Sequence, residues 1–202
     1  FSMKVIAHRG YSAGPIENTI EAFKKSASLR IDGVEFDIRL GTNREVVVSH
    51  NPVEGQKTLT LLEALTYLGS VKFDLYIEFK EYSKDFFDRV VTALRERDLL
   101  QKCVIFAFPN IAQHFPWTES RELQLGIIAP YPSDIKMYIE KFKPDMILLG
   151  WGNKIERMQF KAYWSIFSLA GIFKKYEKTK FVIGVAYNSD DIAWLAKQKG
   201  LH

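Results

Sequence analysis

The stretch "GVEFDIRLGTNREVVVSHN", residues 33–51, decides how many strands of this 202-residue chain run in the same direction. Its two apolar runs, Gly33–Ile38 and Val46–Ser49, both have the composition of β-strands. Only the seven residues 39–45 separate them, which is too few for the helical crossover that two parallel strands require. We therefore expect the second run to return antiparallel beside the first, as a hairpin.

Similar apolar runs recur along the chain, with helical patterns between them, and most are apolar throughout, as in strands buried on both faces. With the hairpin strand set aside, seven strands alternate with helices, which predicts an α/β fold, a TIM (β/α)8 barrel that lacks its last strand. Because the sequence stops at "KQKGLH", we expect the natural chain to continue beyond His202. No repeat or linker is visible, so one domain over residues 1–202 is expected. The predicted strands are Lys4–Ala7, Gly33–Ile38, Val46–Ser49, Phe73–Phe79, Cys103–Phe108, Gln124–Ala129, Asp145–Gly150 and Phe181–Tyr187.

Two helix starts carry capping signals. Asn18 precedes an amphipathic segment and has Glu21 three residues later, and Thr60 has Glu63 at the same spacing. Both patterns are typical of a capping box, in which the first side chain and the later carboxylate satisfy free backbone amides.

Composition limits the classes of function. The chain is 47% hydrophobic, enough for one real core, and no window of 18 apolar residues indicates a membrane span. The single cysteine, Cys103, lies in an apolar run, so we expect no structural disulfide and a reducing, cytoplasmic location. The net charge of +4 favours anionic substrates but is too small to indicate nucleic-acid binding.

Ionisable residues gather at the carboxyl ends of the first three predicted parallel strands and of the hairpin strand, the edge where parallel barrels carry their active sites. Because strand side chains alternate between faces, Glu35 and Asp37 should share one face, and Glu78 and Lys80 should share one face as well. Phe36 should then point to the opposite face, toward the helices. The residues at these ends are His8, Arg9, Glu35, Asp37, His50, Glu78 and Lys80.

These residue types together indicate phosphoester chemistry. Glu35, Asp37 and Glu78 would repel one another unless a hard divalent cation, Mg²⁺ or Ca²⁺, joined them with water and substrate as further ligands. Arg9 and Lys80 add positive charge that suits a phosphate. The histidines His8 and His50 are suited to proton transfer near neutral pH. Taken singly, each group also fits a structural residue, an exposed strand face or a surface ion pair.

Residues 160–176 form an unusually apolar segment that includes "WSIFSLAGIF" and ends with two lysines, Lys174 and Lys175. Two interpretations remain open. The segment either packs into the core or a subunit interface, or makes a weak contact with a lipid surface. The oligomeric state is not predicted.

Four motifs in order resemble the glycerophosphodiester phosphodiesterase family: "HRGYSAGPIENTIEAF", "GVEFDIRL", "VVVSHN" and "YIEFK". The resemblance is strong over residues 4–80 and weaker beyond. It implies a metal-dependent TIM barrel that hydrolyses a glycerophosphodiester to an alcohol and glycerol 3-phosphate, with one divalent ion, Mg²⁺, Ca²⁺ or alternatively Mn²⁺. The implied metal ligands are Glu35, Asp37 and Glu78, the acid–base pair is His8 and His50, and the phosphate-binding residues are Arg9 and Lys80.

The chain also departs from the family pattern. Asn51 replaces the usual Asp after the second histidine, and "GVAYN" replaces the Trp-Thr-Val-Asn motif, so the aromatic wall for the glycerol is missing at Val185. "FAF" stands where a Ser-Phe pair is usual. The stretch "NPVEGQKTLTLLEAL" is much shorter than the usual insertion, so either the pocket lacks its cap or residues are absent after Asn51.

These departures leave the identity of the leaving alcohol open. The first hypothesis is an enzyme for water-soluble glycerophosphodiesters. A lysophospholipase D-type phosphodiesterase acting on lipids is the second, and a non-catalytic phosphate-binding relative is the third.

Overall fold

The computed structural model is an α/β fold whose chain divides into two compact units, residues 4–124 and residues 125–202 together with Met3. Each unit contains parallel strands and helices. The α/β fold class is therefore confirmed, while one domain over residues 1–202 stays a prediction. The structure describes residues 3–11, 15–29, 31–55, 57–118, 122–151, 153–167, 169–184, 186, 189–198 and 201.

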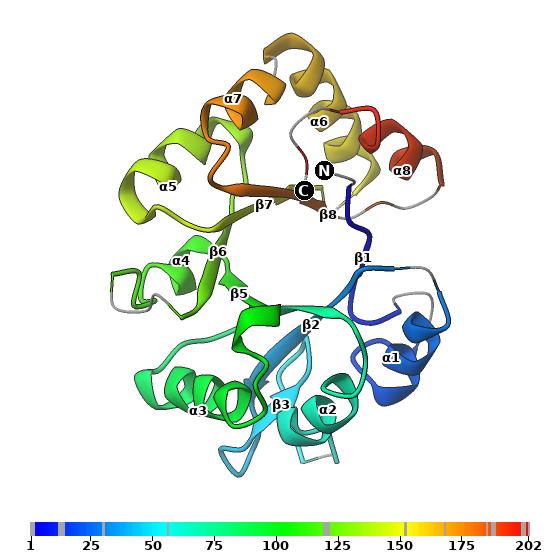
Figure 1. Ribbon diagram of the computed structural model, residues 1–202, viewed down its shortest axis with the longest axis vertical. Coiled ribbons are helices and arrows are strands. Elements are labelled where there is room, and N and C mark those ends of the chain that lie inside the picture. The colour runs from blue at the N-terminus through cyan, green and yellow to red at the C-terminus, as the bar shows by residue number, and fades with distance from the viewer. Residues whose placement is uncertain are drawn as a thin grey trace. The chain divides into compact units, whose positions relative to one another are not determined.

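The first unit contains a sheet of parallel strands in the order β1-β2-β4-β5, with helices packed along one of its faces (Figure 1). The strands are β1 (Ile6–Ala7), β2 (Gly33–Leu40), β3 (Val46–Val48), β4 (Asp74–Phe79) and β5 (Cys103–Ala107). The helices are α1 (Ile20–Ala27), α2 (Leu61–Leu68), α3 (Lys84–Arg95), the 3-10 turn Leu100–Lys102 and the short α4 (Pro109–Ala112).

Strand β3 pairs antiparallel with the end of β2. Leu40 lies opposite Val46, and Ile38 lies opposite Val48. This pairing extends β2 two residues beyond the predicted end at Ile38, because β3 supplies partners for the extra residues. Beyond the paired residues, the Ser49 amide donates a hydrogen bond to the Asp37 carbonyl at 3.0 Å. The chain that follows β3 is thereby fixed beside Asp37.

The two faces of the sheet have different roles. The Phe36 ring of β2 packs on Phe23 of α1 with ring centroids 5.7 Å apart, and the Phe79 ring of β4 packs on Phe86 of α3 at 5.0 Å. On each strand, the residues immediately before and after the phenylalanine must therefore point to the other face of the sheet. Strand alternation thus separates a helix-packed apolar face from the face that carries the ionisable residues.

Helix α1 begins one residue later than expected. Thr19 is its N-cap and accepts a hydrogen bond from the Ala22 amide, so the prediction that Asn18 caps this helix is wrong. Asn18 instead takes a left-handed conformation with a φ of 59°. The other predicted start is confirmed, because Thr60 and Glu63 form a complete capping box at α2.

The second unit has three parallel strands in the order β6-β7-β8, and β6 begins at Gln124, the last residue of the first unit. Its strands are β6 (Gln124–Ile128), β7 (Met146–Gly150) and β8 (Lys180–Gly184). Its helices are the 3-10 turn Pro132–Asp134, α5 (Ile135–Phe142), α6 (Lys154–Phe167), α7 (Leu169–Lys175) and α8 (Ser189–Leu195). Among the described residues no helix combines the length and apolarity needed to cross a membrane.

Gly10, in the turn after β1, should be intolerant of a side chain. Its φ is +77°, and an added Cβ would lie 2.7 Å from the Phe23 ring. We expect Gly10→Ala to lower the free energy of unfolding by about 2–5 kcal/mol, from left-handed strain plus overpacking. Gly55 is the matched control, because its φ is +65° but an added Cβ would meet nothing within 4 Å.

Gly55→Ala should therefore cost only the backbone strain, about 1–2 kcal/mol. Urea unfolding of both variants measures the difference. Equal losses for the two substitutions would show that the Phe23 ring moves aside and that Gly10 is not needed for close packing.

Candidate functional site

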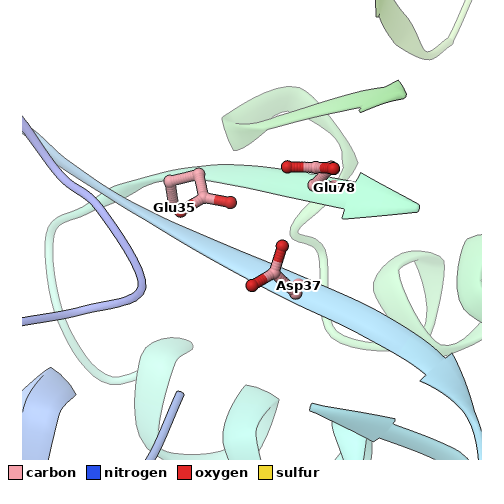
Figure 2. A group of neighbouring side chains, drawn as sticks. All are labelled: Glu35, Asp37 and Glu78. Carbon is pink, nitrogen blue, oxygen red and sulfur yellow. The ribbon is translucent and has the colours of Figure 1, made fainter. Parts of the chain in front are cut away.

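The carboxylates of Glu35, Asp37 and Glu78 meet on the face of the sheet opposite the helices (Figure 2). Asp37 on β2 lies directly opposite Glu78 on β4, and Glu35 precedes Asp37 by two residues on the same strand face. One oxygen from each carboxylate lies within 4.8 Å of the others. All three residues are buried, with 6%, 0% and 8% of their surface exposed, respectively. We call these three residues the carboxylate cluster.

Two cations partly neutralise the carboxylate cluster. Arg9 Nε lies 3.1 Å from Asp37 Oδ2, and the Arg9 backbone amide donates a hydrogen bond to Glu35 Oε2 at 2.8 Å. Lys80 Nζ lies 2.8 Å from Asp37 Oδ1 and also contacts Glu78 Oε1. Three ionised carboxylates beside two cations leave one negative charge uncompensated in a buried place, which is unfavourable.

The electrostatic balance differs among the three acids. Burial raises the pKa of Glu35 well above its usual value, and the neighbouring Asp37 and Glu78 raise it further. Burial also raises the pKa of Glu78, against the opposing effect of Lys80. Burial alone would raise the pKa of Asp37 too, but Lys80, Asn18 and Arg9 together hold it below its usual value. Glu35 is thus the acid whose charge the protein compensates least.

The carboxylate cluster fits a hard divalent cation. Glu35 Oε1 is buried and has no hydrogen-bond partner among the described residues, so this carboxyl oxygen is available as a metal ligand. Three carboxylate oxygens that converge on one point are the donors that Mg²⁺, Ca²⁺ and Mn²⁺ prefer. A bound dication would supply the positive charge that Arg9 and Lys80 leave missing within the carboxylate cluster.

Sequence reasoning missed the role of Asn18. Its Nδ2 donates a hydrogen bond to Asp37 Oδ2 at 2.9 Å, and its Oδ1 accepts one from the Asp37 amide at 3.2 Å. The Asn18 backbone amide also donates a hydrogen bond to the Arg9 carbonyl. The positive φ of Asn18 turns its side chain from the helix to the site, and asparagine tolerates this conformation better than most residues. The sequence signals for this role were that tolerance and the place of Asn18 in the motif "HRGYSAGPIENTIEAF", which resembles the family pattern.

Arg9 is held by more than the carboxylate cluster. Its Nη1 donates a hydrogen bond to Glu17 Oε1 at 2.9 Å. Arg9 has a φ of 52°, so the turn after β1 is tightly constrained. The guanidinium is therefore fixed on two sides, between Glu17 and Asp37.

His8 lies at the edge of the carboxylate cluster, with Nε2 3.8 Å from Glu35 Oε2. Burial, together with the adjacent charge of Arg9, lowers the pKa of His8 to about 4. The ring is therefore neutral near pH 7 and has a lone pair that can accept a proton.

His50 follows β3 and is half-buried. The Arg39 Nε donates a hydrogen bond to the His50 carbonyl at 2.9 Å. In the part of the chain that the structure describes, the one hydrogen bond of its ring joins Nδ1 to Asn51 Oδ1 at 3.1 Å. The structure thus brings six of the seven predicted site residues into one contact network, while the His50 side chain contacts Asn51 instead.

A family model for the glycerophosphoryl diester phosphodiesterase family matches residues 8–147. This chain belongs to that family. A glycerophosphodiester phosphodiesterase of Caldanaerobacter subterraneus is 23% identical over 185 residues, covering 69% of this chain and 74% of that protein. The mouse lysophospholipase D GDPD3 is 45% identical over 51 residues, which cover 25% of this chain and 16% of the mouse protein.

Solved structures share the fold. An Oleispira antarctica phosphodiesterase, solved in complex with its product sn-glycerol-3-phosphate, aligns with a TM-score of 0.79 at 18% identity, over 100% of this chain and 91% of that chain. A glycerophosphodiester phosphodiesterase of Thermotoga maritima aligns with a TM-score of 0.69, also at 18% identity, over 99% and 93% of the two chains. These likenesses support the α/β fold, and family membership makes this protein a phosphodiesterase.

Asn18 should support divalent-metal binding without being a ligand. Asn18→Ala removes both hydrogen bonds to Asp37, so the carboxylate is no longer fixed toward its neighbours. We expect Mg²⁺ or Mn²⁺ affinity to fall about 10- to 100-fold, as for other residues that orient a ligand. Isothermal titration calorimetry measures the affinity. Glu78→Gln removes an anionic oxygen of the cluster and should weaken binding at least as much.

The matched control is Glu81→Gln, because Glu81 accepts a hydrogen bond from the Leu40 amide and lies outside the carboxylate cluster. It should leave metal affinity unchanged. If Asn18→Ala binds the metal as tightly as the unaltered protein, Asn18 only stabilises the turn and does not support metal binding.

Proposed function

We propose that this protein hydrolyses a glycerophosphodiester to an alcohol and glycerol 3-phosphate. The observation that carries the proposal is the carboxylate cluster, in which three buried acids converge beside two cations and a neutral imidazole. Membership of the phosphodiesterase family supports the same reaction. We also propose that the fold is a (β/α)8 barrel and that the protein acts in the cytoplasm, where the buried thiol of Cys103 would stay reduced.

Glu35, Asp37 and Glu78 would hold one divalent ion, Mg²⁺ or Ca²⁺, with Mn²⁺ as an alternative. When bound, such an ion polarises a phosphoryl oxygen and stabilises the charge that develops on it. Lys80 and Arg9 would bind the remaining phosphate oxygens. The Arg9 guanidinium supports this role because Asp37 and Glu17 already fix its orientation, so little side-chain entropy is lost on binding.

His8 and His50 would move the two protons of the reaction. One imidazole accepts a proton from the attacking oxygen, of water or of the glycerol 2-hydroxyl, as that oxygen bonds to phosphorus. The bond from phosphorus to the leaving oxygen then breaks, and the other imidazole donates a proton to the alkoxide. Attack by water gives glycerol 3-phosphate directly. Attack by the 2-hydroxyl gives a cyclic phosphate, which a water molecule then opens to glycerol 3-phosphate by displacing the 2-oxygen. The neutral state of His8 supports its role as proton acceptor, although either histidine can serve as the base.

A lysophospholipase D-type reaction is the second candidate. The observation that favours it is the local similarity to mouse lysophospholipase D, 45% over 51 residues. Both candidates share the same metal site and differ in the group attached to the glycerophosphate. Release of choline or ethanolamine from lysophospholipids therefore separates them.

A substrate panel tests the proposed function. Glycerophosphocholine, glycerophosphoethanolamine, glycerophosphoglycerol and a lysophospholipid are each incubated with Mg²⁺, Ca²⁺ or Mn²⁺. We expect glycerol 3-phosphate to be released from at least one water-soluble diester and EDTA to abolish the reaction. Binding of these diesters without turnover in any of the three metals would contradict the proposal and favour a non-catalytic phosphate-binding protein.

Replacement of either histidine should slow turnover. We expect His8→Ala and His50→Ala each to lower kcat about 10²- to 10⁴-fold, since each removes a proton-transfer group. The double variant should be little slower than the slower single variant, because the two groups act as a unit. His114→Ala is the matched control, since His114 is an exposed histidine on another segment.

A nitrophenyl diester identifies the individual roles. Its leaving group needs no protonation, so it should restore activity to the variant that lacks the acid and leave the variant that lacks the base slow. Full activity of both single variants would rule out the proposed acid–base pair.

Arg9→Lys should impair the enzyme although the charge is kept. Lysine cannot reproduce the planar fork that contacts two oxygens at once. Charge-assisted hydrogen bonds are worth about 1.5–3 kcal/mol each, so the loss of one should lower kcat/KM about ten- to a hundredfold. Steady-state kinetics on the diester turned over fastest measures the effect. Unchanged kcat/KM would mean that Arg9 does not bind the phosphate and only forms ion pairs with Asp37 and Glu17.

A further inference from the structure

Helix α6 exposes a row of large apolar side chains to solvent. Ile155, Met158 and Ile166 are 70%, 73% and 72% exposed. Their spacing, with the exposed Ala162 between them, places all four on one side of the helix. We call these four residues the α6 outer stripe. A helix at a protein surface normally presents polar residues there, so the stripe requires an explanation.

The opposite side of α6 already forms a core of its own. Phe160 and Trp164 are only 5% and 6% exposed, and the Trp164 ring packs edge-on against Phe173 of α7 and Trp194 of α8. On the same helix, Arg157 Nε and Lys161 Nζ each lie 2.8 Å from a carboxylate oxygen of the fully buried Asp191. The α6 outer stripe is therefore not the side that folds the second unit.

This burial bears on the segment 160–176, for which the sequence left two interpretations open. Three of its aromatic side chains, Phe160, Trp164 and Phe173, are in the core, as the first of the two sequence interpretations expects. A lipid contact cannot use them without unfolding the unit. Among the described residues of α6, the exposed large apolar side chains belong to the α6 outer stripe, which begins five residues earlier, at Ile155.

Positive charge accompanies the α6 outer stripe. Residues 125–202 contain 12 Lys and Arg against 7 Asp and Glu, whereas residues 1–124 contain 16 against 17. Exposed lysines lie at the start of α6, at the end of α7 and in the turn after α7, the helix that follows and contacts α6 (Figure 1). These lysines are Lys154, Lys174, Lys175 and Lys178. Apolar side chains combined with lysines characterise helices that lie in the plane of an anionic membrane surface.

A second copy of this chain fits the stripe less well. Four side chains of this size present on the order of a few hundred Å², below the roughly 800 Å² per partner of a standard interface. The flanking lysines would also repel their counterparts in a symmetric dimer unless acids faced them. We propose that the α6 outer stripe and its flanking lysines dock the protein on a lipid surface rich in anionic headgroups. The α6 outer stripe shares no residue with the carboxylate cluster, so its test does not depend on the proposed function.

Vesicle co-sedimentation of the full chain tests the proposal. We expect binding to vesicles of phosphatidylcholine with added phosphatidylglycerol, weaker binding to phosphatidylcholine alone, and weaker binding at about 1 M than at about 0.1 M salt. The triple variant Ile155→Ser, Met158→Ser, Ile166→Ser should lower the partition coefficient about tenfold or more. Because these side chains are exposed, the variant should keep the circular dichroism spectrum and melting temperature of the unaltered protein.

The matched control variant carries Leu29→Ser, Leu62→Ser and Met137→Ser, three exposed apolar residues on other helices or their ends, with exposures of 48%, 52% and 50%. It should bind vesicles like the unaltered protein. No binding by the unaltered protein, or equal loss in both triple variants, would overturn the proposal. A dimer in sedimentation velocity that the stripe variant dissociates, without vesicle binding, would instead assign the stripe to a second copy.

Discussion

The site depends on the mutual repulsion of three buried carboxylates. Charges held this close away from water are strongly unfavourable unless opposite charges and hydrogen bonds surround them. Arg9 and Lys80 supply two of the three charges required, and Asn18 fixes the orientation of Asp37. Glu35 is left with an unpaired oxygen and a raised pKa. Apolar residues at these positions would stabilise the fold at least as well as buried charges do. The arrangement therefore favours a function for the cluster, namely a bound dication.

The backbone makes this cluster from simple constraints. Alternation along β2 places Phe36 in the helix-packed core and Glu35 and Asp37 on the other face. Parallel pairing sets Asp37 opposite Glu78, so three acids meet without any long or flexible connection. Rigid strands suit a site in which small displacements of a ligand cost affinity. The segment after β1 completes the site, because its left-handed residues Arg9 and Asn18 both contact the Asp37 carboxylate.

The sequence predicted much of the site because period-two alternation and the carboxyl ends of parallel strands are properties of the backbone alone. The positions of Glu35, Asp37 and Glu78 follow from that rule. Asn18 was misassigned as a helix cap because a capping pattern one residue away, at Thr19, looks the same in sequence. The α6 outer stripe was also missed, since periodicity shows that a helix has two apolar sides but not which side faces the core.

The central claim is that Glu35, Asp37 and Glu78 together bind one divalent cation. Anomalous diffraction from crystals grown with Mn²⁺ tests it most directly, because the anomalous signal locates the ion itself. The account predicts one peak about 2–2.6 Å from a carboxylate oxygen of each of the three residues, and no peak in Glu78→Gln crystals. Saturating Mn²⁺ that leaves the carboxylate cluster empty, or that binds elsewhere on the protein, would contradict it.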